Sequence, residues 1–170
     1  MDTDRLLRTY VEDHYAGSAG GLALAKRIAG QNKDNEYGRY AAELVAELER
    51  ERDDLTALLK RIGSEPPKFR TLAARGAELA GRLKPNGTVI SYSPLSRVVE
   101  LEGMIMGVTG KLGLWRSLLQ LVDSDERFDR AEIERLAKQA EGQRSRLEEL
   151  HDRAAREALA SGAAHGEKRA

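Results

Sequence analysis

The chain has 170 residues, which suits a single domain, and 41% of them are hydrophobic, enough to form a core. Lys and Arg total 28, and Asp and Glu also total 28, so the sequence lacks the positive charge typical of nucleic-acid binders. The absence of cysteine excludes disulfides, thiolate metal sites and cysteine nucleophiles. The acidic start, Met1-Asp2-Thr3-Asp4, differs from a secretory signal, and we expect a cytoplasmic protein.

Residues 2–29 are predicted to form the first long helix. Apolar and small residues recur there every three or four positions, the pattern of a helix with one buried stripe, and His14 is in register with that stripe. Turn-forming residues follow at 31–35. A second helix then continues the same periodicity to Ile62, and Gly63 is a typical C-terminal signal.

The region 64–93 changes character, and we expect a crossover that contains one short helix over 69–83. Ser93 followed by Pro94 predicts the N-cap and first residue of a third long helix. The apolar positions of this helix follow a strict heptad: Val98, Leu101, Ile105, Val108, Leu112, Trp115, Leu119 and Val122. Asp129 is the predicted N-cap of the last helix, whose apolar stripe continues to Ala158.

Four long helices can bury their stripes only against one another, so the sequence predicts an all-α four-helix bundle. Short turns within each pair and one long connection between the pairs predict two antiparallel hairpins, with the second and third long helices running parallel. We predict a single domain over residues 1–160 and a disordered tail over residues 161–170.

This order of helices resembles the ferritin-like bundle, and Glu148-Glu149-Leu150-His151 looks like the Glu-x-x-His motif of that superfamily. The resemblance implies that carboxylates from the first and third long helices join one Glu-x-x-His from each of the other two around a pair of metal ions. The positions that match are Glu12, Glu100 or Glu102, and Glu148 with His151. The second helix departs from the motif, because Arg50 stands three residues after Glu47.

With one motif missing, we predict no dinuclear centre and no ferroxidase activity. The reduced site implied by the resemblance would use Glu102, Glu148 and His151 to hold Fe or Mn. A separate buried polar layer is predicted for His14, Glu51 and Arg52, because these polar residues occupy or adjoin apolar stripes. The two groups are expected about 12 Å apart along the bundle, from the rise of 1.5 Å per residue.

Two features of the helices remain open to interpretation. Seven glycines lie inside predicted helices, each costing about 1 kcal/mol relative to Ala: Gly17, Gly20, Gly21, Gly103, Gly107, Gly110 and Gly113. Close helix approach, room for an elongated ligand and a local break at Gly20-Gly21 would each explain some of them. The third long helix also carries apolar residues outside its heptad, which either the crossover helix or a second subunit must cover: Met104, Met106, Leu114, Leu118 and Leu121.

Two functional classes follow from these patterns. The first is a non-enzymatic bundle of structural or protein-interaction type, without a cofactor and expected to form a homodimer. The alternative is a ferritin-like metal-binding protein or metal-dependent oxidoreductase with the reduced Glu/His site. We expect neither nucleic acid nor a membrane as a partner, because the charge is balanced and Lys111 and Arg116 interrupt the most apolar segment.

Overall fold

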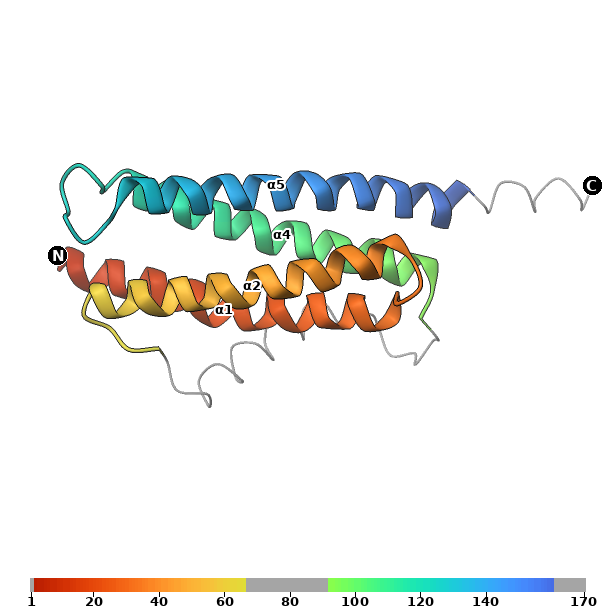
Figure 1. Cartoon of the computed structure of the whole chain (residues 1–170), viewed down its shortest axis with the longest axis horizontal. Helices are drawn as coiled ribbons and strands as arrows, with labels where there is room; N and C mark the ends of the chain where they lie inside the picture. The colour runs from red at the N-terminus through yellow and green to blue at the C-terminus, as the bar shows by residue number, and fades with distance from the viewer. Residues whose placement is uncertain (1, 67–91, 161–170) are drawn as a thin grey trace, which may run out of the picture.

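The computed structural model describes residues 2–66 and 92–160, and every regular element in these residues is helical (Figure 1). The four long helices are α1 (Thr3–Gln31), α2 (Glu36–Arg61), α4 (Pro94–Leu119) and α5 (Arg130–Ala155), and the π-helical turn η1 (Arg156–Ala160) extends α5. The predicted all-α four-helix bundle is therefore confirmed. The crossover helix predicted over 69–83 and the predicted tail at 161–170 lie outside the described residues.

Each long helix begins at a side chain that caps free backbone N–H groups. The predicted starts at Ser93 and Asp129 are confirmed, because these side chains accept hydrogen bonds from the third residue of α4 and of α5. Asn35 caps α2 in the same way, and Asp2 caps α1. Gly63 follows α2 with a φ of 72°, the left-handed conformation that favours glycine after a helix.

The bundle consists of two antiparallel hairpins, α1 with α2 and α4 with α5, joined mainly where α1 packs against α4 (Figure 1). Arg27 of α1 contacts Glu100 near the start of α4, and Tyr10 contacts Ser117 near its end, so α1 and α4 are antiparallel. Since α1 is also antiparallel to α2, helices α2 and α4 run in the same direction. The predicted direction of these two helices is confirmed.

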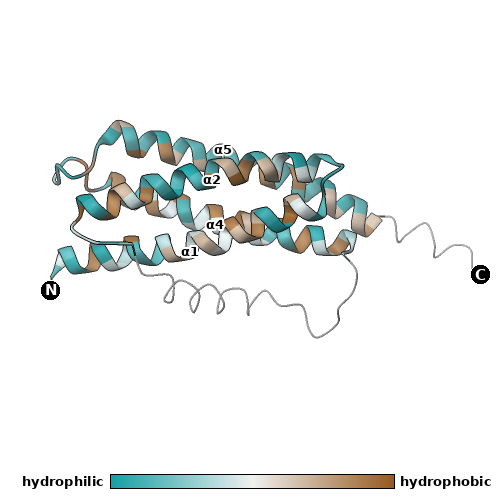
Figure 2. Ribbon diagram, turned by 60° about the horizontal axis from the view of Figure 1, so that its bottom comes forward, coloured by the Kyte–Doolittle hydropathy of each residue, from teal (hydrophilic) through white to brown (hydrophobic). Residues whose placement is uncertain are grey.

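α2 and α5 face each other mainly through polar side chains. Arg61 and Glu132 form a bidentate ion pair with N···O distances of 2.7 and 2.9 Å, and Glu36 pairs with Arg153 at the opposite end. The acidic residues Glu47, Glu51 and Asp54 of α2 thus contact α5. In Figure 2 both helices are largely teal, whereas α4 is largely brown and white.

Burial of α4 corrects one inference from its sequence. Trp115 is 1% exposed, as its heptad position predicts, but Met104, Leu114 and Leu118 are also at most 2% exposed. These three residues need no partner molecule, because α4 lies between α1 and α5 and is covered on two sides. Met106 is different, since 61% of it is exposed.

Six of the seven glycines singled out in the sequence do not mark close contacts between helices. A Cβ atom at any of these six would meet nothing within 4 Å: Gly17, Gly20, Gly21, Gly107, Gly110 and Gly113. α1 also continues unbroken through Gly20-Gly21, so the suggested local break is wrong. The tight position is Gly38, where a Cβ atom would lie 1.9 Å from the carbonyl oxygen of Asn32.

Candidate functional site

One of the polar clusters inside the bundle, which we call the mid-bundle layer, consists of Glu51 of α2, Lys111 of α4 and Gln143 of α5. Glu51 and Gln143 are 3% and 4% exposed, and the Lys111 side chain is 13% exposed. Each residue comes from a different helix, and each occupies a position that packs toward the core. This is the best-protected group of chemically active side chains among the described residues.

Hydrogen bonds close the mid-bundle layer into a ring. The Lys111 ammonium donates to Glu51 Oε2 and, at 2.5 Å, to Gln143 Oε1. The Gln143 amide nitrogen donates to Glu51 Oε1 and to Glu47 Oε2, both at 2.7 Å. Both oxygens of Glu51 and both ends of the Gln143 side chain are therefore satisfied, as buried polar groups require.

The charge of Lys111 depends on this ring. Burial lowers the pKa of Lys111 because desolvation disfavours the ammonium, while the carboxylate of Glu51 acts in the opposite direction. A buried ammonium without a carboxylate partner would be strongly unfavourable. The geometry holds the cation in place, with hydrogen bonds to Glu51 and Gln143.

The predicted grouping of His14, Glu51 and Arg52 is corrected by these contacts. Arg52 donates instead to Ser18 Oγ and to the Tyr15 carbonyl, because successive helical residues point about 100° apart and Arg52 faces α1. His14 packs edge-on against Tyr10, with ring centroids 4.8 Å apart, and burial lowers its pKa. Among the described residues no hydrogen bond joins His14 to Glu51.

The predicted metal ligands come together only in part. His151 Nε2 lies 3.1 Å from Glu102 Oε1, which confirms that these two positions face each other. Glu148 does not join them, because it points outward and lies 3.4 Å from Arg144 Nε. In the described part of the chain, no three His, Asp or Glu side chains are placed to hold a metal ion.

The other carboxylates suggested by the resemblance also lie apart. Glu12 accepts a hydrogen bond from Ser64, and Glu100 pairs with Arg27 at 2.6 Å. Along α4, Glu102 and Lys111 are nine residues apart, or about 14 Å at 1.5 Å per residue. The Glu102–His151 pair and the mid-bundle layer are therefore separate levels of the bundle.

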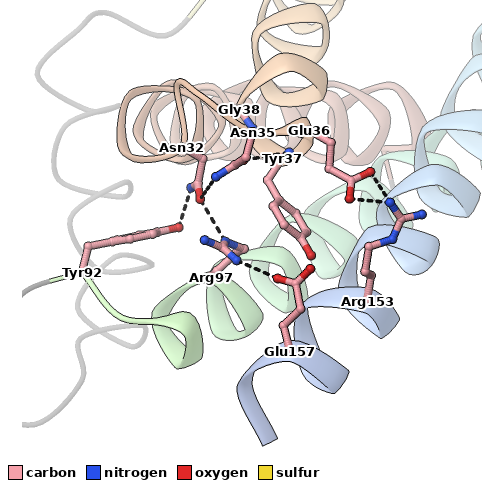
Figure 3. Close-up of polar contacts among 9 residues, drawn as sticks. All are labelled: Asn32, Asn35, Glu36, Tyr37, Gly38, Tyr92, Arg97, Arg153 and Glu157. Atoms are coloured by element: carbon pink, nitrogen blue, oxygen red, sulfur yellow. Dashed lines mark hydrogen bonds and ion pairs between the residues drawn. The ribbon is translucent and has the colours of Figure 1, made fainter. Parts of the chain in front are cut away.

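A second polar cluster lies where the turn between α1 and α2 meets the start of α4 and the end of α5; we call it the Asn32 junction (Figure 3). Asn32 is 2% exposed, and its amide nitrogen donates to the Ile28 carbonyl at 3.0 Å and to the Tyr92 hydroxyl at 2.6 Å. Its amide oxygen accepts from Arg97 Nε at 2.9 Å. One side chain thus links α1 to residues at and just before the start of α4.

Arg97 extends the junction to α2 and η1 (Figure 3). Its guanidinium carbon lies 4.4 Å above the centre of the Tyr37 ring, and its Nη1 lies 3.0 Å from Glu157 Oε2. Burial, reinforced by the adjacent Glu157, raises the pKa of Tyr37 to about 12. The sequence predicted turn formers here but gave no sign that Asn32 would be buried.

A shallow surface hollow between α2 and α5 borders the mid-bundle layer. Tyr40, Glu47, Gln143 and Arg146 contribute to its walls, and burial raises the pKa of the Tyr40 hydroxyl. The Tyr40 hydroxyl donates to the Gln143 carbonyl at 3.3 Å. Lys111 does not line the hollow, so the ammonium is separated from it by the Gln143 side chain.

None of the helices in residues 2–66 and 92–160 is long and apolar enough to cross a membrane. No protein-family model, no curated protein and no solved structure matches the chain. The functional assignment therefore rests on the contacts and surfaces of the described residues.

Proposed function

We propose that this protein is a non-enzymatic, cytoplasmic helical bundle of structural or protein-interaction type that acts as a homodimer. The observation that carries the proposal is the distribution of exposed apolar side chains. Of the six large ones among the described residues, five lie on α1 and α4: Leu6, Tyr10, Leu95, Val99 and Met106. We call these five residues the α1–α4 face.

The α1–α4 face extends over two neighbouring helices, with Leu95 and Val99 near the start of α4 and Leu6 and Tyr10 beside its end. Tyr10 hydroxyl and Ser117 Oγ are 3.3 Å apart, which places the apolar residues of α1 beside the C-terminal half of α4. Met106 is 61% exposed and Leu95 is 55% exposed, although both could be polar at no cost to the core. Clustered apolar exposure of this kind is characteristic of a surface that contacts another protein.

The interior supports a structural role over a catalytic one. The mid-bundle layer satisfies its own charges and hydrogen bonds, and the hollow beside it does not reach the ammonium. Buried polar layers that link several helices can specify helix register. The two hairpins and the parallel direction of α2 and α4 also support placing the bundle in the ferritin-like superfamily as part of this proposal.

Sedimentation equilibrium of the full chain tests the proposed self-association. We expect a dimer of the 18.8 kDa chain at micromolar concentration and a monomer for Met106→Glu. Leu159→Glu is the matched control, because Leu159 is 64% exposed but lies on η1, outside the α1–α4 face. A monomeric wild-type chain at high micromolar concentration would refute homodimerisation.

The second candidate function is binding of a single Fe or Mn ion, and the observation that favours it is the 3.1 Å approach of His151 to Glu102. Elemental analysis of natively purified protein tests it. A bound ion would appear at about one per chain and would be lost in His151→Ala but retained in Glu148→Ala, since Glu148 points away. Metal-free protein that also binds neither ion on titration would eliminate this candidate.

A further inference from the structure

α4 carries a second heptad pattern on its solvent-facing side. Positions that alternate four and three residues apart are all exposed there, and we call them the outer seam: Leu95, Val99, Glu102, Met106, Thr109, Gly113, Arg116 and Gln120. Alternating steps of four and three residues are the spacing of a helix that packs against another helix along its length. The inner heptad packs against α1 and α5, and within residues 2–66 and 92–160 no long helix packs along the outer seam.

The glycines beside the outer seam have no explanation within the described residues. A Cβ atom at Gly110 or Gly113 would meet nothing within 4 Å, yet glycine weakens a helix interior. Glycine at an exposed helix position is explained if another helix approaches closely there. Met106 lies two turns before Gly113 on the same face and provides a large, flexible side chain that could fill such a space.

The seam is complementary to an antiparallel copy of itself. A two-fold axis between Thr109 and Gly110 would bring together positions whose numbers sum to about 219, so Met106 of each chain would pack on the partner subunit's Gly113. The same operation brings Glu102 to within one residue of the level of the partner subunit's Arg116. The knob-and-space pair would therefore occur twice in each dimer. Glu102 and Arg116 also have partners within the chain, His151 at 3.1 Å and Glu141 at 2.8 Å, so an opposite charge from the second copy would add to these exposed contacts.

Apolar residues at the two ends of the α1–α4 face would also meet in an antiparallel dimer. Leu95 and Val99 lie at one end of the α1–α4 face, while Leu6 and Tyr10 lie beside the other end, near Ser117. In an antiparallel arrangement, Leu95 and Val99 of one chain would lie near Leu6 and Tyr10 of the partner subunit. A parallel arrangement would instead place Glu102 opposite Glu102 and Arg116 opposite Arg116.

We propose that two copies of this chain associate through the outer seam, with their α4 helices antiparallel about a two-fold axis at Thr109–Gly110. The inference rests on the proposed function, since it specifies the geometry of the homodimer. The partner is a second copy of this chain, because the charge pattern and the positions of Met106 and Gly113 are self-complementary.

Single-cysteine crosslinking tests the axis directly, because the natural sequence contains no cysteine. Thr109→Cys lies beside the axis, and mild oxidation should convert most of the protein to disulfide-linked dimer. Gln120→Cys is the matched control, since its two copies would lie about 30 Å apart at 1.5 Å per residue. An equal mixture of Val99→Cys and Gln120→Cys chains should form mainly the mixed disulfide.

Charge exchange tests the register by a different measurement. Glu102→Arg alone and Arg116→Glu alone should each raise the dimer dissociation constant about tenfold, because each places like charges together at two symmetric contacts. The double exchange should return the dissociation constant to within about threefold of wild type. Circular dichroism of each variant checks that the bundle remains folded.

The outcomes separate the two proposals. Crosslinking of both Thr109→Cys and Gln120→Cys would indicate parallel helices, and a dimer that forms neither the Thr109 disulfide nor the mixed disulfide would place the interface elsewhere. Either result overturns the inferred geometry and leaves homodimerisation standing. A chain that stays monomeric in sedimentation overturns homodimerisation as well.

Discussion

Replacing Lys111 by Met tests the mid-bundle layer most directly, because Met has a similar length and no charge. The substitution leaves the Glu51 carboxylate 3% exposed and with Gln143 as its remaining donor among the described contacts. Removing one partner of a buried ion pair costs about 3–5 kcal/mol. That is a large fraction of the roughly 5–15 kcal/mol that stabilises a typical domain.

Urea unfolding followed by circular dichroism measures this cost. We expect Lys111→Met to lower the free energy of unfolding by about 3–5 kcal/mol and the melting temperature by about 6–20 °C. The triple variant Lys111→Met, Glu51→Leu, Gln143→Leu should recover most of the loss, because a buried polar group can often be replaced as a whole by apolar residues. A loss below about 1 kcal/mol in Lys111→Met would refute the inference that the layer requires its cation.

The same pair of proteins gives a pH test of the Lys111 environment. Burial lowers the pKa of folded Lys111, whereas the unfolded chain keeps its proton up to the ordinary value of 10.5. Between these values the unfolded state binds more protons, so raising the pH favours the folded wild type relative to Lys111→Met. If the free energy of unfolding changed with pH equally in the two proteins as the pH approaches 10.5, the burial assigned to Lys111 would be contradicted.

Three further predictions concern other parts of the bundle. Gly38→Ala should destabilise strongly, because its Cβ would lie 1.9 Å from the Asn32 carbonyl, whereas Gly17→Ala should stabilise by about 1 kcal/mol; chemical denaturation compares them. Trp115 should emit in the blue and resist acrylamide quenching, and Trp115→Ala should cost about 3–5 kcal/mol. Tyr37 should ionise near pH 12 in tyrosinate absorbance, so its contribution to stability is lost as the pH rises from 10 to 12, and Tyr37→Phe should remove that step.

The architecture could be predicted because helix periodicity and capping are local properties of the sequence. The heptad that begins at Val98 places Trp115 in the core, and Ser93 and Asp129 mark helix starts through bonds to residues three positions away. The hairpin order followed from the lengths of the connections. Each of these signals depends on neighbours within a few residues or on chain length.

The polar contacts required information that one helix cannot provide. Glu51 interrupts its apolar stripe in the sequence, but its partner Lys111 lies on a different helix among apolar residues. The predicted grouping of Glu51 with His14 was wrong because the level of a residue along the bundle does not determine which way its side chain faces. Helix rotation is determined by packing along the whole interface.

The mid-bundle layer and the Asn32 junction fix two points on the same long contact between the hairpins. Measured along α4, Arg97 and Lys111 are 14 residues apart, which corresponds to about 21 Å. One fixed point would still allow the hairpins to pivot, whereas two points at that separation define both their offset and their crossing angle. A variant that loses either point should therefore keep its helices yet sample several orientations, visible as broadened methyl signals in nuclear magnetic resonance before any loss of helical content.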